Sequence, residues 1–181
     1  DPNDRNVYEE LSKVLPSYAP SFLKYNAASV ASLRFQQQEM TRETEELFRK
    51  LGIGKVNGYV EIGTKGRYIS YLKNRLPISG KTYVVNDFEP SLFSPADILE
   101  RTGGYGLADP RSYWRALFKS KFVELSDYDM IHQTEIPNNS VDLATMYMGL
   151  HHAPPEKLRA FVASIYRILR PGGKFILRDH D

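Results

Sequence analysis

Hydrophobic residues in the first 54 positions recur every three or four residues, which is the period of helices that bury one face. One segment ends at Pro16, a second begins at Ser21, and a third begins at Thr41 and ends at Gly52. The first two segments carry the apolar positions Val7, Leu11, Val14, Leu15, Phe22, Tyr25, Val30 and Leu33. We therefore expect an N-terminal helical cap over residues 1–54, which either packs against the rest of the chain or forms a lid over a ligand.

From Lys55 onward, short apolar runs alternate with helical stretches, a pattern typical of strand–helix–strand units. The runs expected to form strands are 58–62, 82–86, 121–125, 142–148 and 174–178. The stretches expected to form helices are 67–75, two short segments within 94–119, and 155–169. Strands joined by helical crossovers make an open, doubly wound parallel sheet of the α/β class, in a domain over residues 55–181. Ligands bind such sheets beyond the carboxyl ends of the strands.

The composition limits the classes of protein to which this chain can belong. The chain has 181 residues, of which 41% are hydrophobic and 25% are charged, values typical of globular proteins. The net charge is +2 and no basic run stands out, so nothing favours a nucleic-acid surface. There is no cysteine, which excludes disulfides, thiolate zinc sites and a cysteine nucleophile. No apolar run reaches the ~18 residues of a membrane span. We expect no membrane partner and take the cytoplasm as the location.

The first strand of the expected sheet ends in an acid and opens into a glycine-bearing turn, Glu61-Ile-Gly63-Thr-Lys-Gly66. Gly63 allows the backbone to approach a ligand closely, and the helix that begins near Arg67 directs its amide ends to the same place. This arrangement suits a nucleoside-type ligand. The same pattern also occurs in tight turns that bind nothing.

Acidic residues follow the next two strands. Asp87 lies 24 residues after Gly63, where a carboxylate can accept hydrogen bonds from both hydroxyls of a ribose. Asp127 follows the third strand and could accept a hydrogen bond from an adenine amino group. A helix cap or a solvated loop acid is the alternative at each position. Acids after three successive strands favour the ligand interpretation.

The fourth strand unit is the most specific. It runs from Pro137-Asn-Asn-Ser-Val-Asp-Leu to Met148-Gly-Leu-His-His and is followed by the helical stretch and Leu169-Arg-Pro-Gly-Gly-Lys. With the acid-ended strands before it, this order resembles the class I S-adenosylmethionine-dependent methyltransferases, particularly the group that acts on small molecules. The resemblance covers about residues 55–181 and implies the sheet order 3-2-1-4-5, with S-adenosylmethionine as the cofactor.

The resemblance also implies a role for each strand end. Glu61 and Gly63 would line the methionine and ribose side of the donor, while Asp87 would hold the ribose hydroxyls. The residues expected at the adenine are Phe88, Asp127 and Tyr128. Those expected beside the reactive sulfonium are Tyr147 and Met148, with His151 nearer the acceptor. Tyr147 and His151 are thus the candidate catalytic residues, His151 as a base for an acceptor that must lose a proton.

Two features depart from the family pattern. Lys65 and Arg67 occupy positions where the family has glycine, with Gly66 between them. Lys65 and Gly66 would then lie near the donor's carboxylate, where Lys65 could form a salt bridge or obstruct binding. In addition, the sequence stops at Asp181, before the last helix and strands of the family core, so we expect a fragment of a longer protein. The fifth strand would then need cover from another chain segment, a partner chain or a second copy.

Several alternatives stay open. A catalytically inactive methyltransferase-like module, kept for assembly or regulation, would also explain Lys65 and Arg67. A nicotinamide-dependent dehydrogenase is disfavoured because the first two glycines of its fingerprint do not match. His151 and His152 could simply pack at the strand end, and a metal site formed with Asp179, His180 and Asp181 lacks ligand spacing, so we expect none. The methyl acceptor is not identified by the sequence.

Overall fold

The computed structural model describes residue 10, residue 13 and the ranges 35–90, 119–147 and 149–179. The first two expected helical segments lie outside these ranges, except for residues 10 and 13, and so do the two short helices expected before residue 119. Within the described ranges, no helix is long and apolar enough to cross a membrane.

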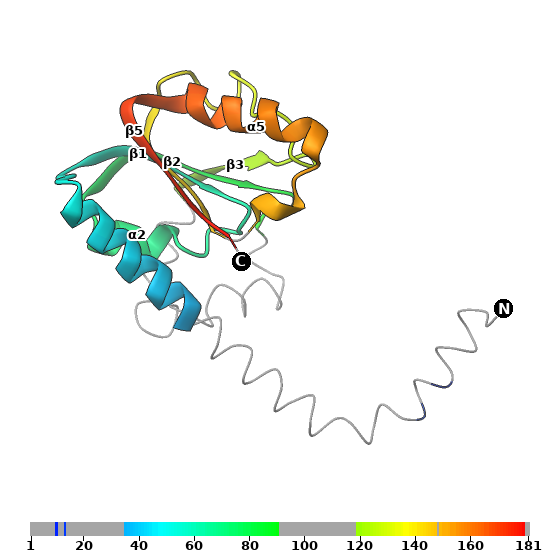
Figure 1. The fold of residues 1–181 in the computed structure, drawn as a ribbon, viewed down its shortest axis with the longest axis horizontal. Helices are drawn as coiled ribbons and strands as arrows, with labels where there is room; N and C mark the ends of the chain where they lie inside the picture. The colour runs from blue at the N-terminus through cyan, green and yellow to red at the C-terminus, as the bar shows by residue number, and fades with distance from the viewer. Residues whose placement is uncertain (1–9, 11–12, 14–34, 91–118, 148, 180–181) are drawn as a thin grey trace.

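A helix over residues 35–50 precedes the sheet and has no label in Figure 1, where it is drawn in blue to cyan. The elements that follow it are β1 (Val56–Ile62), α2 (Ile69–Arg75), β2 (Ile78–Asn86), β3 (Ser120–Glu124), β4 (Val141–Tyr147), the 3-10 helix η1 (Leu150–His152), α5 (Pro155–Ile168) and β5 (Leu169–Arg178).

The five strands form one parallel sheet in the order β3-β2-β1-β4-β5, which confirms the predicted fold class and strand order. Figure 1 shows three layers, with α5 on one face of the sheet and α2 and the helix over 35–50 on the other. Glu61 of β1 pairs with Val84 of β2 and with Thr145 of β4. The carboxyl ends of these three central strands are therefore level, and the loops that follow them meet at one edge of the sheet.

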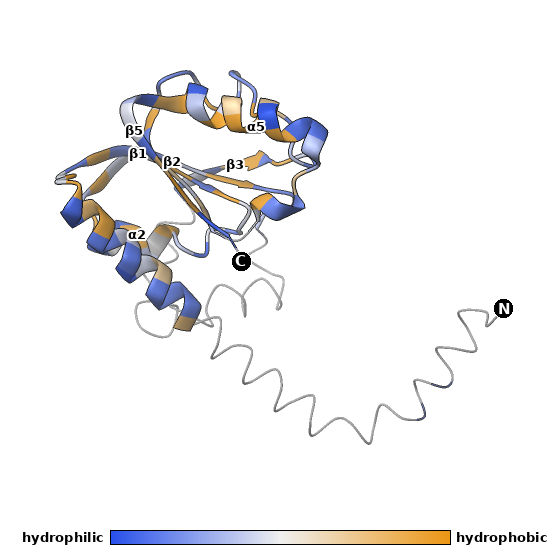
Figure 2. Ribbon diagram, viewed as in Figure 1, coloured by the Kyte–Doolittle hydropathy of each residue, from blue (hydrophilic) through white to orange (hydrophobic). Residues whose placement is uncertain are grey.

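Alternating side chains of each strand build a core on both faces of the sheet. In β1, Val60 and Ile62 are buried towards α5, whereas Tyr59 is buried towards the other helical layer. Met40 and Phe48 extend that second core from the helix over residues 35–50. Figure 2 shows hydrophobic colouring along the strands and hydrophilic colouring over much of the helices. A central parallel sheet covered on both faces produces this pattern, because its strands have no exposed side.

Three expected boundaries were wrong by several residues. The strand β2 begins at Ile78 instead of residue 82. Thr41 does not begin a helix, since the described helix already runs from residue 35 and the Thr41 hydroxyl donates to the carbonyl of Gln37, one turn back. A threonine can make this bond inside a helix, so it is an ambiguous start signal. Likewise β5 begins at Leu169 instead of residue 174, because the register with β4 shifts and takes the Arg-Pro-Gly-Gly segment into the strand.

Candidate functional site

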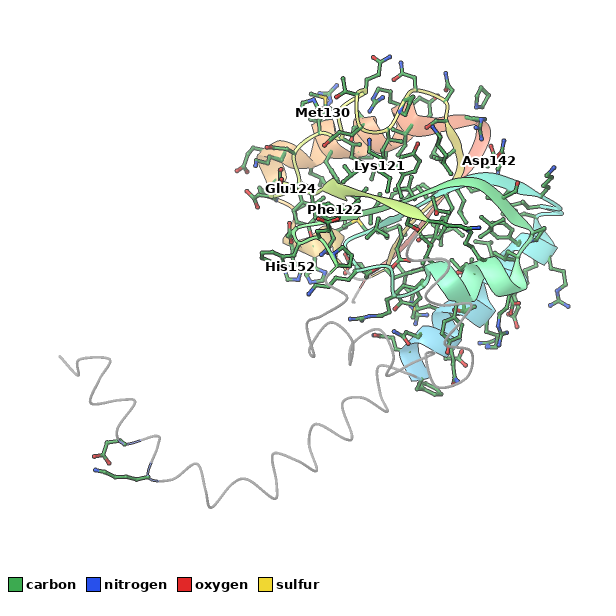
Figure 3. All side chains as sticks on the ribbon, turned by 180° about the vertical axis from the view of Figure 1, so that it is seen from behind. Lys121, Phe122, Glu124, Met130, Asp142 and His152 are labelled. Carbon is green, nitrogen blue, oxygen red and sulfur yellow. The ribbon has the colours of Figure 1, made fainter. Side chains whose placement is uncertain are left out.

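Those expected site residues that lie within the described ranges are at the carboxyl edge of the sheet. Figure 3 shows His152 and Glu124 on this side of the molecule, and Asp142, at the start of β4, on the opposite side. The loops after β1, β2, β3 and β4 meet there because the strands are parallel. This is the edge at which open α/β sheets bind ligands.

The loop after β1 is organised around the carboxylate of Glu61, which is only 1% exposed. The Thr64 hydroxyl donates to this carboxylate, and the backbone N–H of Tyr68 lies 3.2 and 3.1 Å from its two oxygens. The amide at the start of α2 is therefore bonded to Glu61, inside the protein. Glu61 shapes the loop on which a donor would rest, and its predicted contact with the donor stays a prediction.

Burial raises the pKa of Glu61, because a carboxylate is poorly solvated in the protein interior. The hydrogen bonds from Thr64 and Tyr68 and the nearby charge of Arg67 act in the opposite direction. Arg67 therefore occupies a family glycine position while placing its charge close to a buried acid. The role predicted for Lys65, which is half-buried, stays open.

Both glycines of the turn adopt a backbone conformation that favours glycine. Gly63 has φ +79° and Gly66 also has φ +79°. The N–H of Gly63 donates to the Val85 carbonyl at 2.8 Å, which holds the turn against β2. The turn thus keeps a left-handed glycine at Gly66 although Lys65 and Arg67 flank it.

The loop after β2 presents an acid and an aromatic ring to solvent. Asp87 is exposed and Phe88 is 70% exposed. The side-chain amide of Asn86 donates to the Phe88 carbonyl at 3.1 Å, which fixes the path of the backbone there. Asp87 and Phe88 are therefore both open to solvent, and their predicted contacts with the ribose and the adenine of a donor stay predictions.

The loop after β3 turns through three consecutive left-handed residues, Ser126, Asp127 and Tyr128, with φ values of 46°, 53° and 61°. Such a run is unusual for residues other than glycine. The Asp127 side chain is 74% exposed and lies 3.2 Å from the Lys157 ammonium. Tyr128 is buried, and its hydroxyl donates to the Gly149 carbonyl at 2.6 Å. The loop after β3 is thereby tied to the loop after β4.

Tyr147 ends β4 and is buried beneath the helix over residues 35–50. Its hydroxyl lies 2.6 Å from the Thr44 hydroxyl, and its ring packs edge-on against Tyr68 at 4.6 Å between centroids. Burial raises the pKa of Tyr147, so its hydroxyl stays neutral across the physiological range. Met148, predicted to lie beside it, is outside the described residues.

His151 lies in η1 and is paired with an acid that follows β5. Its backbone N–H donates to Asp179 Oδ2 at 2.9 Å, and its ring Nδ1 is bonded to Asp179 Oδ1. The His152 ring lies 4.0 Å away. In the described part of the chain, no three acidic or histidine side chains are placed to hold a metal ion; His180 and Asp181 lie outside that part.

Three further residues contribute to this edge of the sheet and were not among the predicted site residues: Thr44, Thr64 and Asp179. The rule that selected Asp87 and Asp127, an acid directly after a strand, would also have selected Asp179. Thr64 is a neighbour of the glycine turn. Nothing in the sequence indicates the contact between Thr44 and Tyr147, because 103 residues separate them.

Comparison with solved structures shows the same fold in proteins of different activity. A protein from Methanococcus maripaludis, assigned as an S-adenosyl-L-methionine-dependent methyltransferase, is 16% identical, with a TM-score of 0.56 over 86% of this chain and 61% of that chain. A methyltransferase in complex with the Haloferax volcanii Trm112 activator is 16% identical, with a TM-score of 0.51 over 84% of this chain and 54% of that chain. The [4+2]-cyclase SpnF is 15% identical, with a TM-score of 0.51 over 78% of this chain and 46% of that chain.

The chain therefore spans about half to three-fifths of the length of these structures. No curated protein matches it. A family model described as "Methyltransferase domain" matches residues 60–177, which is well over half of the chain. This match agrees with the parallel sheet, the glycine turn and the strand-end acids described above. The chain belongs to the methyltransferase domain family, as its resemblance to the class I S-adenosylmethionine-dependent enzymes indicated.

Proposed function

We propose that this chain is the donor-binding part of an S-adenosylmethionine-dependent methyltransferase. The observation that carries the proposal is the set of loops at the carboxyl edge of the parallel sheet, in a chain that matches the methyltransferase domain model. In particular, Phe88 and Asp87 are exposed directly after β2, where an adenosine can stack on the ring and bond to the carboxylate. A ring that is 70% exposed has a face available for stacking on a ligand.

In this proposal, each site residue contacts a different part of the donor. Asp87 holds the ribose hydroxyls and Phe88 lies against the adenine, with Asp127 and Tyr128 at its rim. Gly63 and Gly66 let the backbone pass close to the donor, and Lys65 lies near the donor's carboxylate. Glu61 stabilises the conformation of this loop from the protein interior, because its carboxylate accepts hydrogen bonds from the Thr64 hydroxyl and the Tyr68 amide. When bound, S-adenosylmethionine supplies an electrophilic methyl group on a positively charged sulfur.

Catalysis in this proposal comes mainly from alignment. Tyr147 fixes the end of β4 against the helix over residues 35–50, and η1 places His151 beside that strand end. Holding donor and acceptor in line supplies much of the rate of a displacement reaction. His151 acts as a base where the acceptor carries a proton that must leave.

Calorimetric titration with S-adenosylmethionine, S-adenosylhomocysteine and NAD tests the proposal. We expect micromolar binding of the first two and none of NAD. Binding of neither adenosyl ligand up to millimolar concentration would favour the second candidate, an inactive module. Arg67 and Lys65 in glycine positions favour that candidate, and SpnF, named a cyclase, shows that a neighbour of this fold carries another activity.

A partner at the edge of the sheet is a further part of the proposal. Within the described ranges, β5 pairs with β4 and with no other strand. We propose that another chain segment, a partner chain or a second copy covers this edge, as unpaired strands are usually covered. The Haloferax volcanii methyltransferase, which forms a complex with an activator, is a precedent for a partner chain. Light scattering measures the molar mass of the purified chain, alone and mixed with a candidate partner chain, and so separates these cases. A cytoplasmic location stays a prediction.

A further inference from the structure

A cavity lies at the amino edge of the sheet, opposite the loops proposed to bind the donor. Its volume is about 420 Å³, which is within the range of small-molecule sites. One wall is the turn before β4, with Asn138 and Asn139, and the other is the segment from Tyr166 to Gly173, where α5 joins β5. Asp142, at the start of β4, marks this edge of the sheet in Figure 3.

Backbone hydrogen bonds hold the two walls of the cavity together. The N–H groups of Asn139 and Ser140 donate to carbonyls in the last turn of α5, at 3.0 and 2.8 Å. Unpaired carbonyls at the end of a helix carry a partial negative charge, which disfavours an anion. Because the turn before β4 occupies the carbonyls of Arg167 and Ile168, these two groups are not available to repel an anionic ligand.

The guanidinium of Arg167, which lines the cavity, makes hydrogen bonds only to uncharged groups of the described chain. Its Nη1 donates to the Ile136 carbonyl at 3.1 Å and to Asn138 Oδ1, and its Nη2 donates to the Ile131 carbonyl at 2.6 Å. Burial lowers the pKa of Arg167, and no described carboxylate acts in the other direction. Since an arginine stays ionised in proteins, the cavity contains a positive charge without a counter-charge.

The neighbouring arginine has a different environment. The Arg170 guanidinium lies 2.8 Å from Asp142 Oδ1, so its charge is compensated. A further cation, the ammonium of Lys174, donates to the Gly172 carbonyl in the cavity wall at 2.8 Å. Among the described residues, none that lines the cavity is acidic. The cavity therefore has a net positive charge.

The polar groups that remain for a ligand are hydrogen-bond donors. Within the described ranges, the Nε–H of Arg167 makes no hydrogen bond. A guanidinium can only donate, so the amide of Asn138 turns its oxygen to Arg167 and keeps both N–H donors for another partner. Tyr166 is 81% exposed, and its ring provides a flat apolar face beside these donors. Positive charge, donors and an aromatic ring thus occur together.

We propose that this cavity is a second binding site of the protein, for a small aromatic carboxylate. The carboxylate accepts hydrogen bonds from Arg167 Nε and the Asn138 amide, and the aromatic ring stacks on Tyr166. Hydrogen bonds between a guanidinium and a carboxylate are about twice as strong as those between neutral groups. An aliphatic carboxylate would leave the Tyr166 ring in water, and a neutral aromatic molecule would leave the charge of Arg167 without a partner. The site does not depend on the proposed methyltransferase function.

Amide NMR of the whole chain, titrated with 2-naphthoate, tests the inference. We expect the signals of Asn139, Ser140, Gly172 and Gly173 to shift, with a dissociation constant of about 1 mM for a ligand of this size. The shifts should be the same with and without S-adenosylhomocysteine, because the cavity lies at the opposite edge of the sheet from the proposed donor site. Neutral 2-naphthamide should bind about tenfold more weakly, and cyclohexanecarboxylate, which has no aromatic ring, about two- to tenfold more weakly.

Substitutions in the cavity test the charge and the ring separately. Asn138→Asp places a carboxylate beside Arg167, where it competes with the ligand, so we expect binding to weaken about tenfold or more. Gln38→Glu adds the same charge at an exposed position of the helix over residues 35–50 and is the matched control with unchanged binding. Tyr166→Ala should weaken binding about two- to tenfold, whereas Tyr166→Phe keeps the ring and should bind as the wild type does.

Several results would overturn the inference. No shift up to about 10 mM 2-naphthoate would do so, as would shifts confined to the carboxyl edge of the sheet. Equal affinity for 2-naphthamide would refute the anionic class of the ligand, and an Asn138→Asp chain that binds as tightly as the wild type would refute the role of Arg167. Failure to bind S-adenosylhomocysteine alone would contradict the proposed function and leave this inference intact.

Discussion

The two sides of the carboxyl edge differ in the burial of their polar side chains. Beneath the helix over residues 35–50, the polar groups of Glu61, Thr44 and Tyr147 are buried and bonded within the protein. On the other side, after β2 and β3, Asp87 and Asp127 are exposed. The buried side therefore fixes the shape of the edge, and the exposed side offers groups to a ligand. A strand-end acid has a different role depending on which side it occupies.

The largest effect is expected at Tyr147, on the buried side. Tyr147→Ala removes a fully packed ring that contacts Tyr68 and bonds to Thr44, so we expect the free energy of unfolding to fall by about 3–5 kcal/mol. Tyr147→Phe is the matched control, because it keeps the ring and loses about 1 kcal/mol with the hydrogen bond. Urea denaturation measures both. Equal losses in the two variants would mean that the hydroxyl, not the packing, secures the helix.

On the exposed side, Asp87→Ala is expected to act on binding and not on stability. Loss of the bonds to the ribose should weaken S-adenosylhomocysteine binding by about 1.5–3 kcal/mol, the value of hydrogen bonds to a charged group. The free energy of unfolding should change by no more than about 0.5 kcal/mol, because Asp87 is exposed. Glu46→Gln, which changes an acid paired with Arg42 on the helix over residues 35–50, serves as the control with unchanged affinity. An unchanged dissociation constant in Asp87→Ala would refute the ribose assignment.

Substitutions at Thr64 test whether the buried side stabilises the glycine turn that borders the exposed side. Thr64→Val keeps the shape of the side chain and removes the hydroxyl that donates to Glu61, so we expect a loss of about 1–3 kcal/mol in the free energy of unfolding. Thr64→Ser retains the hydroxyl and should lose less. Thermal and urea unfolding report the stability, and titration with S-adenosylhomocysteine reports whether the glycine turn keeps its shape. A stable Thr64→Val chain would show that Glu61 does not need this bond.

The smallest expected effect is a dependence of stability on pH. Burial raises the pKa of Glu61 in the folded chain, so the folded state binds its proton more tightly than the unfolded state does. As pH rises from the ordinary pKa of a glutamate to the raised value, Glu61 should lower the free energy of unfolding, by up to about 1.4 kcal/mol per pH unit. Glu61→Gln lacks this titration. The stability of the variant relative to wild type should therefore increase across this pH window and then level off; a constant difference would contradict the direction of the shift.

The strand pattern was predictable because parallel strands buried on both faces leave a strong sequence signal. This signal predicted the five apolar runs and placed Glu61, Asp87 and Asp127 at or after strand ends, whereas the order of the strands was implied by the resemblance to the class I methyltransferases. Boundaries were less reliable: Thr41 lies within a helix, and the Arg-Pro-Gly-Gly segment joins β5. In each case a local signal was overridden by pairing or bonding with a neighbouring element.

The sequence by itself determined which elements form and which residues follow each strand, because hydrophobic period and turn chemistry are local properties. Only the tertiary structure decided what those residues do. It turned the Glu61 carboxylate inward to Thr64 and Tyr68, left Asp87 in solvent, and bonded His151 to Asp179. Contacts between residues far apart in the chain depend on how the layers pack, and no pattern within a single segment records them.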